Sequence, residues 1–289
     1  MNILVLGGNG YLGSKVLGTL LEENQHTVTC TVRSTSSLSK ISSYLGEIVL
    51  IPASLDAVKT ATKYVSFNAV INMSCSYGKK STLYKNVIEA NIDFPLQVLN
   101  CVVENGCRRF LTIGTGLPDE LNMYSFSKKM FGEFGRYYAN NHGIDFFNLK
   151  LQMFYGSDEP GDRFIPQLIQ KMIYGQDVNV TLGTQHRDII AVQDVIKAII
   201  AVFHSELHGY QEISVGTGVA PTISELVDYI WHTTGKRSQV HKGAVPMREN
   251  EPDCVAELGK LNEIIDWKPV QWQQGILGMI EEMRGRSDV

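Results

Sequence analysis

The stretch Gly7-Gly8-Asn9-Gly10-Tyr11-Leu12-Gly13 decides the fold, because it joins an apolar strand pattern at residues 3–6 directly to an amphipathic helical pattern. Three glycines at this spacing allow a tight turn, a close approach of backbone N–H groups to a pyrophosphate, and close packing of the helix on the strand. The helix start adds its positive dipole end. We therefore expect a dinucleotide to bind at Gly7, Gly10, Tyr11, Leu12 and Gly13. A flexible loop without a ligand is the alternative.

Beyond this turn, short apolar runs alternate with longer amphipathic runs, which predicts buried parallel strands with helices between them. The predicted strands are residues 3–6, 27–32, 48–51, 69–73, 109–113 and 145–151. Later helices are predicted at residues 165–174, 192–203, 223–233 and 274–283. The expected fold class is α/β, a Rossmann-type doubly wound parallel sheet with a smaller mixed C-terminal lobe.

Glycine, proline and aspartate gather just after residue 155, which predicts a boundary there. We expect a dinucleotide-binding domain at residues 1–155, including the catalytic residues. Residues 156–289 should form most of a substrate-binding lobe, with some segments returning to the sheet.

The composition and charge of the chain limit the classes of partner that it is expected to bind. The chain has 289 residues, 44% of them apolar, and a net charge of -4 without a basic run, so neither nucleic acid nor a membrane surface is expected as a partner. Neither a signal peptide nor a membrane span is apparent, which indicates a cytoplasmic protein. The five cysteines lack CxxC spacing, so no metal or redox site is expected.

The second predicted strand ends in Arg33-Ser34, where an NAD site usually carries an acidic residue for the ribose 2′-hydroxyl. An arginine instead matches a 2′-phosphate. The cofactor expected is NADPH (NADP), with NAD less favoured. The alternative is a solvated surface arginine.

Tyr124 and Lys128 lie four positions apart and share one face of a predicted helix. A nearby cation favours the phenolate form of a tyrosine, whose ordinary pKa is about 10, and such a pair can transfer protons. Tyr11 and Lys15 have the same spacing, so position separates the two pairs. Only Tyr124 follows the fifth predicted strand, whose end carries the Thr115 hydroxyl. An ordinary exposed helix face is the alternative interpretation.

With these elements in order, the chain resembles the extended short-chain dehydrogenase/reductase family, also called the NAD-dependent epimerase/dehydratase family. The segments Val70-Ile71-Asn72-Met73-Ser74-Cys75, Glu89-Ala90-Asn91 and Lys150-Leu151-Gln152-Met153-Phe154 carry the likeness. The resemblance implies catalytic roles for Thr115, Tyr124 and Lys128. It also implies cofactor binding by Arg33, Ser34, Ser54, Leu55, Met73, Ser74, Cys75, Asn91, Lys128, Gln152 and Phe154.

Later segments, Arg163-Phe164-Ile165-Pro166 and residues 183–189, resemble the nucleotide-sugar-binding segments of the family. The resemblance implies that Arg187 contacts a diphosphate, with Arg248 as a second phosphate ligand; an ion pair of Arg187 with Asp188 is the alternative. The substrate-binding residues implied are Ser76, Tyr77, Thr115, Met153, Phe164, Ile165, Arg187 and Arg248.

Within the family, the likeness is greatest to ketoreductases of the CDP-abequose synthase type, which make deoxyhexoses for bacterial surface polysaccharides. It implies NADPH-dependent reduction of the C4 ketone of a CDP- or dTDP-linked 4-keto-6-deoxyhexose. Dehydration is disfavoured, because Thr115 is followed by Gly116-Leu117 and not by the Asp-Glu pair of dehydratases. A 4-epimerase with retained NAD and a non-catalytic NADPH sensor are the alternatives. Many relatives dimerise, so a homodimer is expected.

Overall fold

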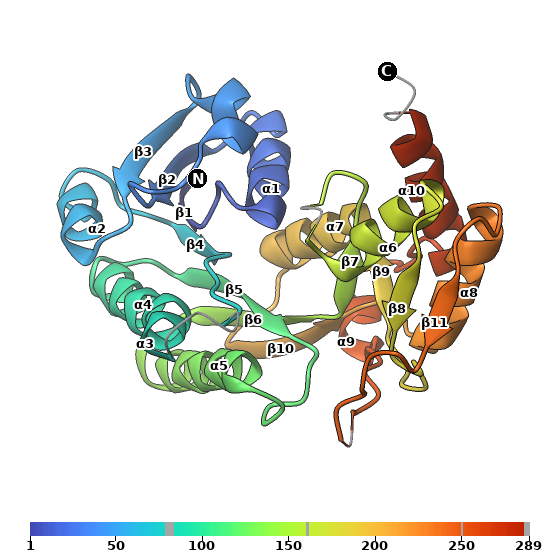
Figure 1. The fold of residues 1–289 in the computed structure, drawn as a ribbon. Helices are drawn as coiled ribbons and strands as arrows, with labels where there is room; N and C mark the ends of the chain where they lie inside the picture. Colours follow the sequence, from blue (N-terminus) through green and yellow to red (C-terminus); the bar gives the residue numbers. More distant parts are fainter. Residues whose placement is uncertain (79–83, 160–161, 250, 286–289) are drawn as a thin grey trace. The chain divides into compact units, whose positions relative to one another are not determined.

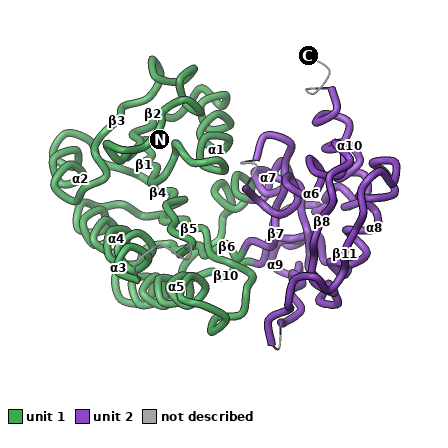
Figure 2. The backbone as a smooth tube through the Cα atoms, viewed as in Figure 1, with its two compact units in different colours: residues 1–150, 199–213 green, residues 151–198, 214–289 purple. Residues whose placement is uncertain are grey.

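The computed structural model describes residues 1–78, 84–159, 162–249 and 251–285. The chain divides into two compact units (Figure 2). The first comprises residues 1–150 and 199–213, and the second comprises residues 151–198 and 214–289.

A seven-stranded sheet in the order β10-β6-β5-β4-β1-β2-β3 forms the centre of the first unit (Figure 1). Its strands are β1 (Asn2–Leu6), β2 (Thr27–Val32), β3 (Ile48–Pro52), β4 (Ala69–Asn72), β5 (Arg109–Thr115), β6 (Asp145–Leu151) and β10 (Tyr210–Val215). Strand β1 runs parallel to both of its neighbours, in the register Leu4↔Thr29 and Leu4↔Val70. The expected Rossmann-type sheet is confirmed. From β1, the chain adds β2 and β3 on one side of the sheet and then β4, β5 and β6 on the other side. The glycine turn after β1 therefore lies at the point where the strand order reverses, which is where such sheets bind ligands.

The central strands of the sheet are buried along both faces, which helices of the first unit cover. The helices are α1 (Tyr11–Glu22), α2 (Leu55–Thr62), α3 (Tyr84–Ile88), α4 (Phe94–Glu104) and α5 (Met123–His142), with a π-helical turn at Glu89–Asp93 and a 3₁₀ turn at Ser39–Tyr44. Strand residues Leu4, Val70 and Phe110 form one core with apolar residues of α2, α4 and α5. These three helices therefore cover one face of the sheet.

The seventh strand, β10, is the main departure from the six strands expected. Its sequence, Tyr-Gln-Glu-Ile-Ser-Val, mixes polar and apolar residues because β10 is an edge strand and only partly buried. An edge strand does not need the continuous apolar run of a central parallel strand. The strand was therefore hard to see in the sequence.

The second unit has its own apolar core between short strands and helices. It contains β7 (Met153–Tyr155), β8 (Val178–Val180), β9 (Ile189–Ala191), β11 (Val240–Lys242), α6 (Phe164–Ile173), α8 (Ile223–Thr233), α9 (Gly259–Ile264) and α10 (Trp272–Gly285). β7 pairs with β9, and β8 pairs with β11. The core gathers Ile169, Leu226 and Ile280 from α6, α8 and α10. Helix α7 (Val192–His204) begins in this unit and ends in the first.

Candidate functional site

The glycine turn has the geometry that its sequence predicts. Gly7 has a φ of +75°, and a Cβ there would lie 2.8 Å from the backbone nitrogen of Ser74. A Cβ on Gly13 would lie 2.2 Å from the carbonyl oxygen of Gly7. Gly10 is the N-cap of α1, and its N–H donates to the Gly7 carbonyl over 3.1 Å. Only glycine fits at positions 7 and 13 without rearrangement.

Tyr11 and Leu12 open α1 immediately after the turn. The Lys15 ammonium lies 5.2 Å from the centroid of the Tyr11 ring, a cation–π contact inside α1. Tyr11 and Lys15 therefore contact each other within α1, on a different helix from Tyr124 and Lys128.

Arg33 and Ser34 follow the end of β2 and are exposed. The side-chain amide of Asn9 in the glycine turn donates to the Ser37 carbonyl over 3.2 Å, which holds the turn against the loop that carries Arg33. At the end of β3, Ser54 caps α2 by accepting from the Ala57 N–H. These loops follow the carboxyl ends of neighbouring parallel strands, where a dinucleotide lies in sheets of this type.

A buried polar network lies at the end of β4. The Asn72 amide donates to the Thr112 hydroxyl over 3.1 Å, and its oxygen accepts from the Ser74 N–H at 3.1 Å and the Ser74 hydroxyl at 2.6 Å. Asn72 and Thr112 are almost fully buried. Met73 and Cys75, which flank Ser74, are half-buried. Asn72 thus fixes the conformation of the turn that carries the three predicted cofactor-binding residues.

Helix α5 presents the Tyr/Lys pair. It begins with a capping box in which the Asn122 side chain accepts from the Ser125 N–H and the Ser125 hydroxyl accepts from the Asn122 N–H. Lys128 is 4% exposed, and its Nζ donates to the Ser74 carbonyl over 3.2 Å. Burial lowers the pKa of Lys128 from its ordinary value, and the nearby Cys75 opposes this effect.

Tyr124 lies one turn before Lys128 and is half-buried. Its ring packs on the ring of Tyr77, with centroids 5.0 Å apart and planes inclined by 40°. Tyr77 is 45% exposed. The structure therefore places a predicted substrate-binding residue against the predicted proton donor.

Asn91 lies in the π-helical turn between α3 and α4, an irregularity often found at functional sites. Its oxygen accepts from the Ser76 N–H over 2.7 Å, and its amide donates to the Ser76 carbonyl and to the Ser127 hydroxyl, each over 2.9 Å. Asn91 therefore ties the loop after β4 to α5, between Tyr124 and Lys128.

Thr115 is the last residue of β5, and its hydroxyl oxygen accepts from the Leu117 N–H over 3.3 Å. Thr115 and Lys128 line one polar pocket of about 210 Å³, together with Gly114, Asn148 and other residues of the first unit. A Cβ on Gly114 would lie 2.4 Å from the Asn148 Oδ1, so Asn148 fills the space that a side chain at position 114 would need.

Sequence reasoning missed Asn148 and its partner Glu212. The Glu212 carboxylate accepts from the Asn148 amide, from Lys150 and from the Tyr210 hydroxyl, at 3.4, 3.4 and 3.1 Å. Gly114 leaves space for a neighbouring side chain, but no local pattern in the sequence identifies Asn148 or Glu212 as that neighbour.

The second unit holds the remaining predicted residues. Gln152 donates its N–H to the Val215 carbonyl over 2.9 Å, and Met153 and Phe154 lie in β7. Phe164 at the start of α6 is 39% exposed, whereas Ile165 is buried in the core.

Arg187 is 5% exposed, and its guanidinium binds Glu251 at 2.5 Å and the Pro252 carbonyl. Arg248 is largely exposed and lies 4.0 Å from the same Glu251. The acid that pairs with Arg187 is thus Glu251. Asp188 instead accepts hydrogen bonds from Thr217, Gly218 and Ala256.

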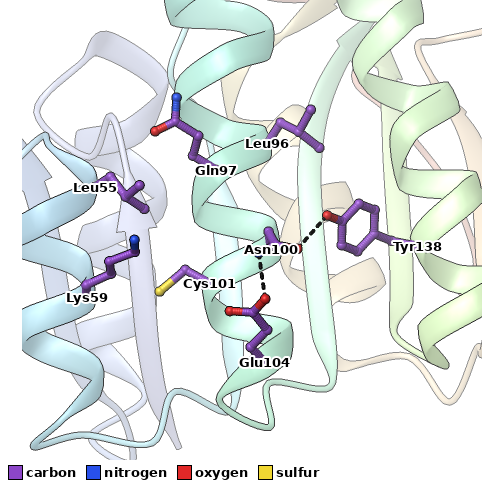
Figure 3. A pocket seen from close by; sticks show the side chains of 8 residues that line it. All are labelled: Leu55, Lys59, Leu96, Gln97, Asn100, Cys101, Glu104 and Tyr138. Atoms are coloured by element: carbon purple, nitrogen blue, oxygen red, sulfur yellow. Dashed lines mark hydrogen bonds between the residues drawn. The ribbon is translucent and has the colours of Figure 1, made fainter.

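A larger pocket of about 440 Å³ lies between α2, α4 and α5 (Figure 3). Leu55 lines it, as do Asn100 and Tyr138, whose side chains share a hydrogen bond of 2.8 Å. Thr115, Tyr124 and Lys128 do not line this pocket. It is therefore separate from the predicted catalytic group.

Comparison with known proteins identifies the family of the chain. Residues 3–216 match the profile of the NAD dependent epimerase/dehydratase family. The CDP-abequose synthase of Salmonella typhimurium is 27% identical over 297 residues, which cover 97% of this chain and 98% of that protein. The resemblance to CDP-abequose synthases is thereby confirmed.

Among solved structures, the UDP-glucose 4-epimerase of Thermotoga maritima with UDP-glucose has a TM-score of 0.86 at 19% identity, covering 99% of this chain and 100% of that one. The Thermus thermophilus UDP-glucose 4-epimerase, in complex with NAD, has a TM-score of 0.83 at 21% identity and covers 99% of both chains. These structures share the fold. Within the described ranges, none of the helices has the length and apolar character to span a bilayer.

Proposed function

The chain belongs to the NAD dependent epimerase/dehydratase family, and on this premise we propose that it is an NADPH-dependent 4-ketoreductase of nucleotide sugars. The proposed substrate is a CDP- or dTDP-linked 4-keto-6-deoxyhexose, and the product is a deoxysugar nucleotide for O-antigen synthesis. One observation carries the proposal. The Ser74 backbone packs closely against Gly7 of the glycine turn, and its carbonyl oxygen accepts a hydrogen bond from Lys128. The predicted cofactor-binding turn and the helix that carries the predicted catalytic pair are therefore neighbours.

The glycine turn and the exposed Arg33 fit a phosphorylated dinucleotide. Backbone N–H groups at the start of α1 suit a pyrophosphate, and a guanidinium suits a 2′-phosphate. We propose NADPH over NAD on the basis of Arg33, although the Thermus thermophilus relative is bound to NAD. Bound NADPH would supply hydride to C4 of the sugar.

The residues of the chain would supply the proton and hold the oxygen. The Tyr124 phenol donates its proton to the C4 oxygen as that oxygen gains negative charge. The buried Lys128 ammonium stabilises the phenolate that remains, because the two charges attract strongly where water is excluded. Thr115 accepts the Leu117 N–H, which leaves its own hydroxyl proton for the substrate oxygen. Solvent then reprotonates Tyr124.

In the second unit, we propose that Arg187 and Arg248 bind the diphosphate. Both arginines share Glu251, which holds Arg187 at 2.5 Å and lies 4.0 Å from Arg248. A diphosphate would compete with Glu251 for the exposed Arg248 first.

The second candidate is a nucleotide-sugar 4-epimerase with retained NAD. The fold match to UDP-glucose 4-epimerases favours it. It would use Thr115, Tyr124 and Lys128 to oxidise and then re-reduce C4. Arg33 counts against it, because the ribose 2′-hydroxyl of NAD is usually bound by an acid at this place.

Mixing the purified chain with NADPH and CDP- or dTDP-linked 4-keto-6-deoxyglucose tests the proposal. A stoichiometric loss of reduced-nicotinamide absorbance supports a reductase. Isomerisation without net oxidation would support the epimerase. Cofactor binding without turnover would leave a non-catalytic NADPH sensor, the third candidate. Tyr124→Phe should abolish turnover and preserve cofactor binding; full activity in this variant would exclude the mechanism.

Arg33→Ala gives a separate test of the cofactor. It should raise the KM for NADPH and leave the KM for NADH unchanged, because only NADPH carries the 2′-phosphate. An equal change in the KM for NADPH and the KM for NADH would contradict the proposed preference for NADPH.

We also propose a cytoplasmic setting and a homodimer. The five cysteines are all free thiols, as is usual in a reducing compartment. The homodimer rests on the family resemblance, and Tyr137 on α5 is an exposed aromatic side chain that such a contact would bury.

A further inference from the structure

Three potential metal ligands converge in the first unit, apart from the predicted catalytic group. Glu23 follows α1, His26 precedes β2, and His204 is the last residue of α7. Glu23 and His204 are 181 positions apart in the chain. No spacing motif in the sequence therefore reveals the group.

All three side chains direct a ligand atom to the same place. The Nε2 of His26 lies 2.6 Å from the Glu23 Oε2, and the Nε2 of His204 lies 3.0 Å from the same oxygen. The ligand atoms all lie within 4.8 Å of one another. The two imidazole rings are nearly parallel, with planes inclined by 22°. Both rings thus present the same nitrogen to one carboxylate.

The surroundings favour a cation. Helices α1 and α7 both end here, and the C-terminal end of a helix carries partial negative charge. The Glu23 side chain lies between the two imidazole nitrogens and offers a carboxylate oxygen, which is a common ligand of divalent metal ions.

We propose that Glu23, His26 and His204 bind a divalent transition metal ion of the zinc type, with water as the fourth ligand. Two imidazole nitrogens and a carboxylate are a common ligand set for Zn²⁺. Zinc at about 2.0–2.2 Å from each ligand atom would need those atoms slightly more than about 3 Å apart. Small side-chain adjustments reach that spacing from the observed distances.

The site would be structural, not catalytic. Helix α1 begins at the glycine turn and ends here, and its 12 residues span about 18 Å. The metal would join residues 1–150 to the segment 199–213 within the first unit. The proposal does not depend on the proposed reaction.

The environment of His26 limits the affinity of the proposed site for zinc. Its side chain is 2% exposed, and its Nδ1 has no hydrogen-bond partner within the described residues. A metal-bound histidine usually donates this second N–H to an acceptor, and loss of such support costs about 10–100-fold in affinity. We therefore expect zinc to bind about 10–100-fold more weakly than at a site whose histidines all have such an acceptor.

Calorimetric titration of tag-free, EDTA-dialysed full-length protein with zinc sulfate tests the proposal. One ion should bind per chain and raise the thermal unfolding temperature, and EDTA should reverse the rise. Magnesium should not compete, because it prefers oxygen ligands. Absence of 1:1 binding, or full competition by magnesium, would overturn the proposal.

His204→Asn is the decisive variant, because His204 is 37% exposed at its side chain and its loss should not prevent folding. It should weaken zinc binding by at least about tenfold, because the loss of even an outer-shell partner of a ligand costs about 10–100-fold in affinity. His208→Asn is the matched control, since His208 lies four residues further on and pairs with Asp145. Wild-type affinity in His204→Asn, or equal losses in both variants, would exclude this site.

Discussion

The Lys128 ammonium donates a hydrogen bond to the Ser74 carbonyl oxygen, 3.2 Å away. Ser74 is itself held through its N–H and its hydroxyl by the buried Asn72. The position of Lys128 therefore depends on two strands, β4 and β5, because Asn72 also bonds to Thr112. The sheet therefore helps to position Lys128, in addition to helix α5.

Lys128→Met should slow turnover strongly without unfolding the protein. Positioned proton-transfer groups contribute about 10²–10⁴-fold to rate, so we expect kcat to fall by that order. The unfolding temperature should stay equal or rise, because a buried charge is replaced by an apolar side chain of similar length. Lys129→Met is the control, since Lys129 is exposed and pairs with Asp119. Wild-type kcat in Lys128→Met would contradict the assigned role.

Asn72→Ala should destabilise the protein and weaken cofactor binding together. The variant leaves the buried Thr112 hydroxyl and the Ser74 N–H without their partner, and unpaired buried groups cost about 1–3 kcal/mol each. Urea unfolding and the KM for NADPH measure the two effects. Asn100→Ala should change both only slightly, because Asn100 is exposed on α4. An unchanged KM would mean that Asn72 does not position the turn.

Local pattern predicted the elements well. The expected strand at residues 27–32 and helix at residues 223–233 match β2 and α8 residue for residue. Residues 27–32 alternate β-branched threonine with valine and cysteine, and residues 223–233 have one apolar face, so local pattern alone indicates both elements. The fifth strand was expected to end at residue 113, but it extends to Thr115, the predicted catalytic residue.

Contacts between residues far apart in the chain could not be predicted from the sequence. Arg187 and Glu251 lie 64 positions apart, and nothing local indicates that they pair. The same holds for Gly114 and Asn148, which meet across β5 and β6. The Ser74–Lys128 bond joins residues 54 positions apart. Such pairs follow from strand order, which periodicity does not specify.

Gly135→Ala and Gly278→Ala should shift stability in opposite directions. A Cβ on Gly135 of α5 would lie 2.1 Å from the Phe146 ring, which stacks on Phe110 at 5.3 Å and cannot easily retreat. Overpacking of this kind costs about 1–3 kcal/mol. Gly278 lies in α10 with no atom within 4 Å of the added Cβ. Alanine should stabilise there by about 0.5–1 kcal/mol. Denaturant midpoints measure both; the same sign for both variants would refute the packing argument.

Tyr155→Phe should stabilise the second unit. The Tyr155 hydroxyl is buried and has no hydrogen-bond partner among the described residues, and burial raises its pKa. An unpaired buried hydroxyl costs about 1–3 kcal/mol, so its removal should raise the free energy of unfolding by about 1 kcal/mol. A Cβ on Gly275 would lie 1.9 Å from this oxygen. Gly275→Ala should therefore be less harmful when combined with Tyr155→Phe than in the wild type, and additive effects would contradict the contact.

Glu159 should make stability depend on pH. Burial raises the pKa of this carboxyl from 4.5 to about 7, although Arg163 opposes the rise. Because the folded pKa is the higher one, the folded state binds more protons between these two values, and the free energy of unfolding falls as pH rises through the window. At about 1.4 kcal/mol per pKa unit, the shift from 4.5 to about 7 corresponds to a total loss of about 3.5 kcal/mol. Stability is greatest below pH 4.5 for this group and lowest above about pH 7.

Glu159→Gln isolates this contribution, because glutamine keeps the shape of the protonated acid and does not ionise. Urea unfolding at about pH 5 and about pH 8, on either side of most of this window, should show a smaller loss of stability at the higher pH in the variant than in the wild type. The exposed Glu257→Gln should retain the wild-type difference. The comparison between the two variants is decisive, since other groups also titrate in this range. If Glu159→Gln loses as much stability as the wild type, the buried carboxyl does not carry the effect.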